Sequence, residues 1–105
     1  MTFNEYQKTA FEFALPKAKS ITYMVLGVAN ESGEVAGKLK KYFRGDERSQ
    51  SLHDEIAAEL GDCLWYLAGL ASMLQMDLSE IAQRNIDKLR SRQGRGKLTG
   101  SGDER

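Results

Sequence analysis

The stretch DEIAAELGDCLWYLAGLASMLQM, residues 54–76, decides the fold that we expect for this chain. Its apolar side chains recur every three to four residues, which is the spacing of a helix face and not the alternation of a strand. From Leu64 to Met76 the stretch is apolar almost all round, so it must be covered on more than one side. It therefore predicts an all-α protein built around this helix.

Three further segments have helical patterns, and no strand pattern competes with them. We expect helices over about residues 2–15, 21–43, 51–76 and 77–92. Thr2 with Glu5 has the spacing of a capping box, Pro16 ends the first helix, and Ser51 and Asp77 are candidate N-caps. The remainder, QGRGKLTGSGDER, is rich in glycine and charge. The sequence thus predicts a four-helix, bundle-forming domain over residues 1–92 and a flexible C-terminal tail over 93–105.

Composition excludes several classes of protein. The 105 residues carry 15 basic and 15 acidic side chains, whereas binding to nucleic acid or to a membrane surface requires a basic excess. The single cysteine, Cys63, cannot form an internal disulfide, and no cysteine-histidine cluster indicates zinc. The N-terminus lacks the apolar run of a signal peptide, and nothing approaches the roughly 20 apolar residues of a membrane span. We therefore expect a cytoplasmic protein without nucleic-acid or membrane partners.

Two pairs of carboxylates are the main candidate functional residues of the sequence. Glu31 and Glu34 lie three residues apart on the second helix, as do Glu59 and Asp62 on the third. Each pair spans about 60° around its helix and so faces one side. The midpoint between the pairs falls in the polar loop GDERSQ, so an antiparallel hairpin folded there places them level. Because both pairs also lie to the same side of the apolar stripes, we expect all four carboxylates to converge.

Four carboxylates in a partly buried cleft must be protonated or neutralised by cations. Hard oxygen ligands of this kind suit Mg²⁺ or Mn²⁺. A single Glu-x-x-Glu pair is usually only the solvated face of a helix. The prediction of a metal site therefore depends on the matched height and edge of the two pairs.

The segments GVANESGEVAGKLKK, DEIAAELGDCLWYLAGLA and NIDKLRSR together resemble the MazG-like nucleotide pyrophosphohydrolases, or all-α NTP pyrophosphatases. The likeness covers roughly residues 20–92 and rests on Glu-x-x-Glu on one helix and Glu-x-x-Asp on the next. Asn30 and Ala58 depart from the wider form of the motif, which has glutamate at both positions. The four inner positions match.

This resemblance implies an all-α NTP pyrophosphatase-like fold in which Glu31, Glu34, Glu59 and Asp62 hold Mg²⁺. It further implies hydrolysis of a nucleoside triphosphate to the monophosphate and pyrophosphate, as in house-cleaning of the nucleotide pool. Metal ions neutralise phosphate oxygens and lower the pKa of a bound water. Glu31 or Glu34 would then act catalytically, by orienting that water or accepting its proton.

Four further residues are expected to bind the substrate. Lys38 follows Glu34 by four residues and Tyr66 follows Asp62 by four, so each shares a face with carboxylates, although Lys38 could instead pair with Glu34. Asn85 and Lys88 match the segment that binds phosphate and sugar in the family. If the fourth helix folds back at about Asp77, Lys88 comes level with Tyr66. The expected substrate-binding residues are Lys38, Tyr66, Asn85 and Lys88.

The third helix is too apolar for the short first and fourth helices to cover, so we expect a homo-oligomer, either a dimer or a tetramer. The alternative to an enzyme is a non-catalytic helical oligomerisation or interaction module, in which the carboxylates form a solvated or partner-binding face. Added Mg²⁺ distinguishes the two, because a true cation cluster is stabilised by its ion.

Overall fold

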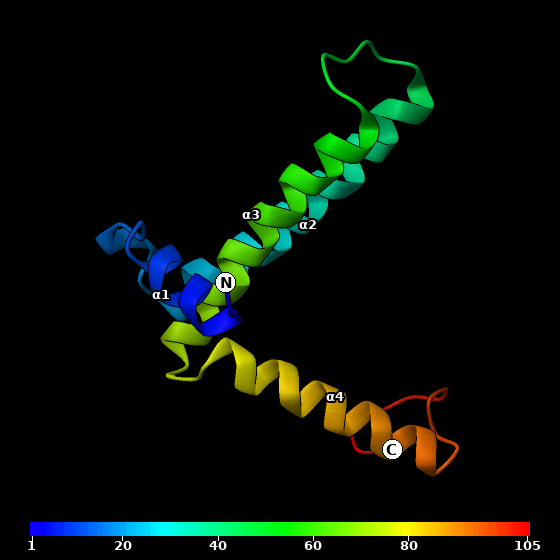
Figure 1. Ribbon diagram of the computed structural model, residues 1–105. Coiled ribbons are helices and arrows are strands. Elements are labelled where there is room, and N and C mark those ends of the chain that lie inside the picture. The colour runs from blue at the N-terminus through cyan, green and yellow to red at the C-terminus, as the bar shows by residue number, and fades with distance from the viewer.

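The structure, a computed structural model that describes residues 1–105, is built from helices alone (Figure 1). Helix α1 spans Phe3–Phe11, the short 3-10 helix η1 Pro16–Ala18, α2 Ile21–Arg44, α3 Leu52–Met73 and α4 Leu78–Gly94. The prediction of an all-α protein with four α-helices is confirmed. Helix α1 ends four residues earlier than expected, and the other ends differ by three residues or fewer.

Most of the predicted helix starts have the expected caps. Thr2 and Glu5 form the capping box of α1, and the Ser51 hydroxyl accepts a hydrogen bond from the Asp54 N–H at the start of α3. Asp77 occupies the N-cap position of α4, but its side chain makes no capping bond. Side chains from α1 cap α4 instead, as the Leu78 N–H donates to Gln7 Oε1 at 2.7 Å and the Ser79 N–H to Asn4 Oδ1 at 3.1 Å.

The Gln7 side chain joins three helices at one point. It is buried, and its amide nitrogen also donates to the Ser72 hydroxyl at 3.1 Å and to the Met76 carbonyl at 2.9 Å. A buried amide with all these partners satisfies polar groups at the end of α3 and the start of α4 that would otherwise lack partners. Gln7 therefore fixes how α1 lies across the base of the molecule.

Helices α2 and α3 form an antiparallel hairpin that projects from this base (Figure 1). Two glycines allow close approach, because a Cβ on Gly27 would collide with the Tyr66 ring and one on Gly69 would lie 2.6 Å from Met24 Sδ. Residue 27 thus faces 66 and residue 24 faces 69, and both midpoints fall between Asp46 and Glu47. This is the register that the carboxylate spacing predicts.

Helix α4 does not fold back along α3, contrary to expectation. It leaves the base in another direction, with the turn through Gln75 at a φ of +58° and with its start held by α1 (Figure 1). The contacts that direct α4 come from α1, which is remote in sequence. Lys88 is consequently not level with Tyr66 within one chain.

The buried core is confined to the base. It consists of two small groups, one around Met24 and the other around Ala68, Ala71 and Leu78. Along the hairpin, apolar residues that the helical pattern assigns to the core are exposed to solvent. Leu60 is 55% and Leu67 44% exposed. No helix of the structure combines the length and the apolar character needed to cross a membrane.

Substitution of two glycines in α2 tests the packing of the hairpin. Gly27→Ala should lower the free energy of unfolding by about 1–3 kcal/mol, because the new methyl group displaces Tyr66. Gly33→Ala is the matched control, since a Cβ there meets no atom within 4 Å. The control should leave stability unchanged or raise it by up to about 1 kcal/mol through helix propensity. Urea unfolding measures both, and equal stability of the two variants would contradict the close contact.

Candidate metal centre

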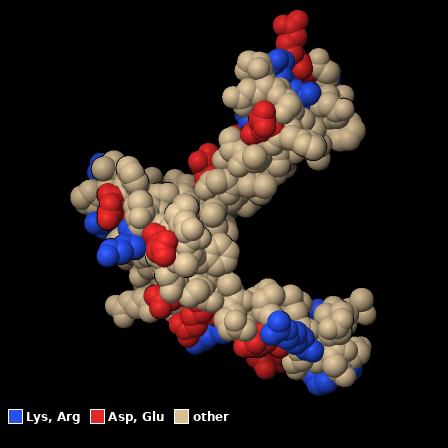
Figure 2. All heavy atoms as spheres, viewed as in Figure 1, with Lys and Arg blue, Asp and Glu red and all other residues tan.

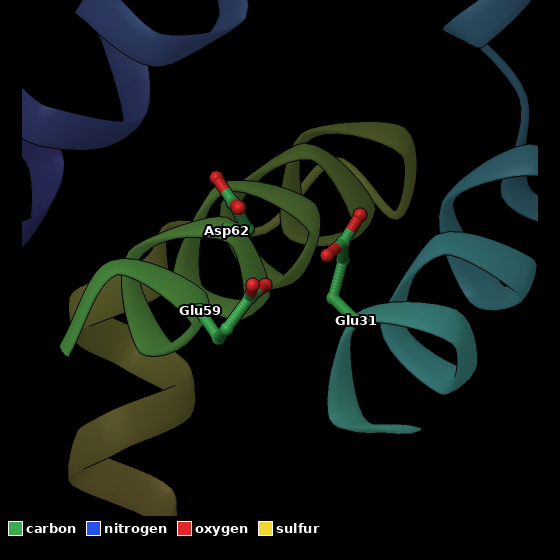
Figure 3. A group of neighbouring side chains, drawn as sticks. All are labelled: Glu31, Glu59 and Asp62. Carbon is green, nitrogen blue, oxygen red and sulfur yellow. The ribbon is translucent and has the colours of Figure 1, made fainter. Parts of the chain in front are cut away.

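Three of the four predicted carboxylates come together across the hairpin (Figure 3). Glu31 projects from α2, and Glu59 and Asp62 project from successive turns of α3. One carboxylate oxygen from each lies within 4.8 Å of the others. Glu34 is exposed and outside this group, so the expected convergence holds for three carboxylates and not for the fourth. We call Glu31, Glu59 and Asp62 the carboxylate cluster.

Glu31 experiences the strongest electrostatic effect in the cluster. Its pKa is raised above the ordinary value, first by burial and then by the negative charges of Asp62, Glu59 and Glu34. A hydrogen bond from Asn30 opposes the rise of this pKa. Like charges at this separation disfavour ionisation, so the cluster favours a bound proton or a cation.

Lys38 supplies one positive charge beside the cluster. Its Nζ lies 3.6 Å from Glu59 Oε1 across the hairpin. The sequence left open a pairing of Lys38 with Glu34 on the same helix, and the structure pairs it with Glu59 on α3 instead. Both side chains are partly buried, so the contact is less screened than a surface ion pair. One lysine cannot neutralise three carboxylates.

Tyr66 lies on the carboxylate side of α3, as predicted. Its ring packs over Gly27 and meets the Trp65 ring edge-on at 5.0 Å between centroids. The pKa of Tyr66 is raised, first by burial, then by Tyr23 and by the charges of Glu31 and Asp62. The hydroxyl is therefore a neutral donor beside the cluster at ordinary pH.

Tyr66 also borders an apolar hollow of about 290 Å³ that sequence patterns did not indicate. The hollow lies between the residues before α2 and the rings on α2 and α3. The Trp65 indole N–H is fixed by donation to the Ala10 carbonyl at 3.0 Å. The lining residues come from three separate segments, so periodicity within one helix could not reveal them. They are Phe13, Leu15, Lys17, Ala18, Tyr23, Trp65 and Tyr66.

The remaining two predicted substrate-binding residues lie elsewhere. Asn85 and Lys88 are on α4, which diverges from the hairpin, and Lys88 Nζ is 2.7 Å from Asp103 Oδ1. One chain therefore brings Lys38 and Tyr66 to the carboxylate cluster but not Asn85 or Lys88.

The cluster has the chemistry of a site for a hard divalent cation. All its candidate ligands are carboxylate oxygens, which Mg²⁺ and Mn²⁺ prefer, and no thiol or imidazole is in the group. Burial, and then the negative charges of Asp62, Glu59 and Glu34, raise the pKa of Glu31, and Lys38 is the one cation paired within the cluster. Three carboxylates also leave coordination positions for water and for substrate oxygens.

Removing the charge of Glu31 should stabilise the metal-free protein at neutral pH. Folded protein keeps the Glu31 proton to a higher pH than unfolded protein, so the free energy of unfolding falls as pH rises through the raised pKa. Glu31→Gln should remove the part of this pH-dependent loss of stability that comes from ionisation of Glu31. Glu34→Gln, at an exposed carboxylate outside the cluster, is the control and should change the free energy of unfolding at neutral pH less than Glu31→Gln does.

Urea unfolding in the presence of a chelator, from mildly acidic to neutral pH, measures this difference. If Glu31→Gln were no more stable than Glu34→Gln at neutral pH, the repulsion within the cluster would be refuted.

Comparison with known proteins agrees with this geometry. Residues 19–96 match the MazG nucleotide pyrophosphohydrolase domain, which confirms the resemblance seen in the sequence motifs. The chain is also similar to the "Gene 37 protein" of Mycobacterium phage L5, with 44% identity over 89 residues, covering 83% of this chain and 78% of that protein. No solved structure matches the chain significantly. A match over most of the sequence, with the three carboxylates assembled by the hairpin, shows that the chain belongs to the MazG nucleotide pyrophosphohydrolase family.

Proposed function

We propose that this protein is a Mg²⁺-dependent nucleoside triphosphate pyrophosphohydrolase, which converts an NTP or dNTP and water to the monophosphate and pyrophosphate. Mn²⁺ would substitute for Mg²⁺, and the cellular role would be house-cleaning of the nucleotide pool. The observation that carries the proposal is the convergence of Glu31, Glu59 and Asp62 across the hairpin of a MazG-family chain.

In this proposal Glu31, Glu59 and Asp62 hold the metal, with Glu34 at its edge. The bound ion supplies neutralisation of phosphate oxygens and a water of lowered pKa. Glu34 lies one turn from Glu31 and is exposed, which leaves it free to accept the proton of the attacking water. Lys38, beside Glu59, adds a positive charge on the side where the phosphate chain would lie.

Attack at the α-phosphorus, with pyrophosphate leaving, is favoured by two features. The chain has no Gly-x-x-x-x-Gly-Lys loop to hold terminal phosphates as P-loop enzymes do. The aromatic hollow beside Tyr66 has the apolar walls that suit a nucleobase. A base seated there would bring the adjacent end of the phosphate chain to the carboxylate cluster.

We also propose that the enzyme is a homo-oligomer, a dimer or a tetramer. A compact domain of this length has a radius of gyration of about 13 Å, against the observed 16.6 Å. The accessible surface of 7717 Å² exceeds by about 1,800 Å² the value for a compact monomer of this size. A standard interface buries about 800 Å² on each partner, so the excess is enough for more than one contact.

The hairpin is the surface that a second copy would cover. In the view of Figure 2 much of the hairpin is uncharged, and charged side chains gather near its tip, over the base and on α4. The hairpin also carries exposed leucines, Leu26 on α2 and Leu60 and Leu67 on α3. In such an assembly a partner would supply Asn85 and Lys88, which one chain holds away from its own cluster.

Loss of a single ligand charge tests the metal site. We expect Glu59→Gln and Asp62→Asn each to lower kcat/KM for triphosphate hydrolysis about a hundredfold or more, because an amide is a poorer Mg²⁺ ligand than a carboxylate. Asp54→Asn, an exposed carboxylate in the first turn of the same helix, is the matched control and should retain activity.

The products decide which reaction the enzyme performs. Chromatography should show monophosphate and pyrophosphate in equal amounts from the first time point. Diphosphate with free phosphate would refute the assigned bond cleavage. Absence of hydrolysis, together with no rise in melting temperature on addition of Mg²⁺, would favour the non-catalytic interaction module.

Light scattering tests the assembly. At micromolar concentration we expect the mass of a dimer or tetramer, and Leu60→Glu should shift it toward the monomer by placing a charge in the covered face. Glu47→Gln, on the loop at the hairpin tip, is a control that should leave the mass unchanged. A stable monomer of the unmodified chain would contradict the proposed oligomer.

A further inference from the structure

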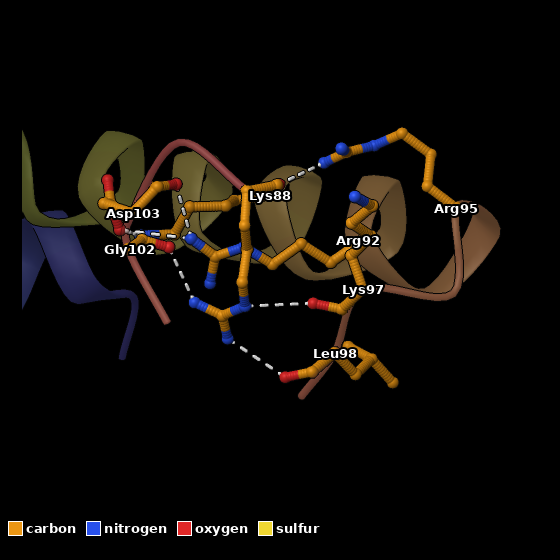
Figure 4. A network of polar contacts seen from close by, with 8 residues as sticks. Lys88, Arg92, Arg95, Lys97, Leu98, Gly102 and Asp103 are labelled. Carbon is orange, nitrogen blue, oxygen red and sulfur yellow. Dashed lines mark hydrogen bonds and ion pairs between the residues drawn. The ribbon is translucent and has the colours of Figure 1, made fainter. Parts of the chain in front are cut away.

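The C-terminal residues 95–105, which belong to the predicted tail, form a loop that turns back along α4 (Figure 4). The Arg105 guanidinium donates to the carbonyls of Lys97, Leu98 and Gly102 at 3.0, 3.0 and 2.8 Å. Arg95 in turn donates to the Arg105 carbonyl at 2.7 Å. The loop is thus held by its own arginines.

Glycines permit the turns of this loop. Gly96, Gly100 and Gly102 have φ values of +68°, +115° and +87°, a region that other residues rarely adopt. A loop whose turns and arginine contacts agree in this way has one preferred course, which presents Asp103 to α4.

Asp103 lies between two cationic side chains of α4. Its Oδ1 accepts from Lys88 Nζ at 2.7 Å and from Arg92 Nη2 at 3.2 Å, and Arg92 Nη2 also donates to the Asp103 carbonyl at 2.6 Å. Arg92 is only 6% exposed, so its charge requires a fixed partner. Arg92 therefore anchors the loop, and Asp103 pairs with the Lys88 ammonium as well.

Lys88 retains two unpaired donors and lines a cavity. Its ammonium has three protons, of which Asp103 accepts one. The cavity, about 500 Å³, has an apolar side and a polar side to which Asp103 belongs. Lys88 and Arg92 together outnumber Asp103 by one positive charge, so the site retains attraction for an anion. The other lining residues are Leu74, Met76 and Ile81 on the apolar side and Arg84, Asn85 and Lys88 on the polar side.

We propose that the C-terminal loop is a wall of the substrate site and that Asp103 is a positioning residue, which holds Lys88 for the phosphate chain of the nucleotide. The inference rests on the proposed function, since it takes Lys88 to bind substrate phosphate. It adds a segment outside the helices to the site. It also gives the loop a role in binding, not in the chemical step.

Calorimetry with inorganic tripolyphosphate in the presence of Mg²⁺ tests this role. Removing a negative charge by itself favours an anionic ligand, so weaker binding can arise only from lost positioning. We expect Asp103→Asn to raise the Kd about fivefold, the size of effect that one partly exposed ion pair allows. Glu104→Gln removes the same charge from the next residue, which has no ion-pair partner, and serves as the matched control.

Kinetics on a nucleoside triphosphate separate positioning from a general structural effect. Asp103→Asn should raise KM with kcat changed by less than about twofold, and Asp103→Glu should restore part of the loss. Arg105→Gln, which frees the loop without altering Lys88 or Asp103, should raise KM as well. Arg90→Gln, an exposed arginine of α4, controls for the loss of positive charge.

The outcomes separate the two proposals. Tripolyphosphate binding that depends on Asp103, without nucleotide hydrolysis by the unmodified protein, would support the positioning of Lys88 by Asp103 for a polyphosphate and would overturn both the proposed hydrolysis and the place of the loop in its substrate site. Normal hydrolysis with an unchanged KM in Asp103→Asn would overturn the inference alone. Tighter binding by Asp103→Asn than by Glu104→Gln would overturn it too, because Asp103 would then compete with the substrate for Lys88.

Discussion

The close contact of α2 with α3 is the constraint on which the rest of the molecule depends. Gly27 admits the Tyr66 ring and Gly69 admits Met24, and these two contacts hold the helices in the observed register. In that register Glu31 faces Glu59 and Asp62. A slip of one helical turn would separate these carboxylates, because a turn advances a helix by about 5.4 Å. The packing of apolar and small residues thus fixes the geometry of the charged ones.

Repulsion within the carboxylate cluster acts against the helix packing that brings the three carboxylates together. Burial and mutual repulsion raise the pKa of Glu31, and Lys38 offsets only part of the negative charge. The hairpin holds these groups together because Met24 and the aromatic rings beside it bury apolar surface one to two turns away. A bound proton or a divalent cation would relieve this repulsion, and the proposed function takes the second alternative.

Within one chain, Lys88 on α4 lies away from the carboxylate cluster on the hairpin. Capping of α4 by Asn4 and Gln7 directs Lys88 away from the cluster, while the flank of the hairpin presents leucines to solvent. One event, the association of a second copy, would cover the leucines and could bring a Lys88 to the site. The proposed role of the C-terminal loop agrees with such an assembly, because Asp103 pairs with a lysine that lies away from the hairpin of its own chain.

The sequence by itself determined the helices, the hairpin register and the two carboxylate pairs that the hairpin brings level, because helical periodicity and loop position can be read along the chain. It also indicated the family through its motifs, as the match over residues 19–96 confirmed. Only the tertiary structure decided that Glu34 stays outside the cluster, that Lys38 pairs with Glu59, and that α4 diverges. It likewise decided that the last residues form a loop closed by Arg105. The course of α4 depends on contacts between segments far apart in sequence, such as Gln7 with Leu78, which no local pattern encodes. The loop depends instead on contacts of Arg105 with nearby carbonyls, which helical periodicity does not describe.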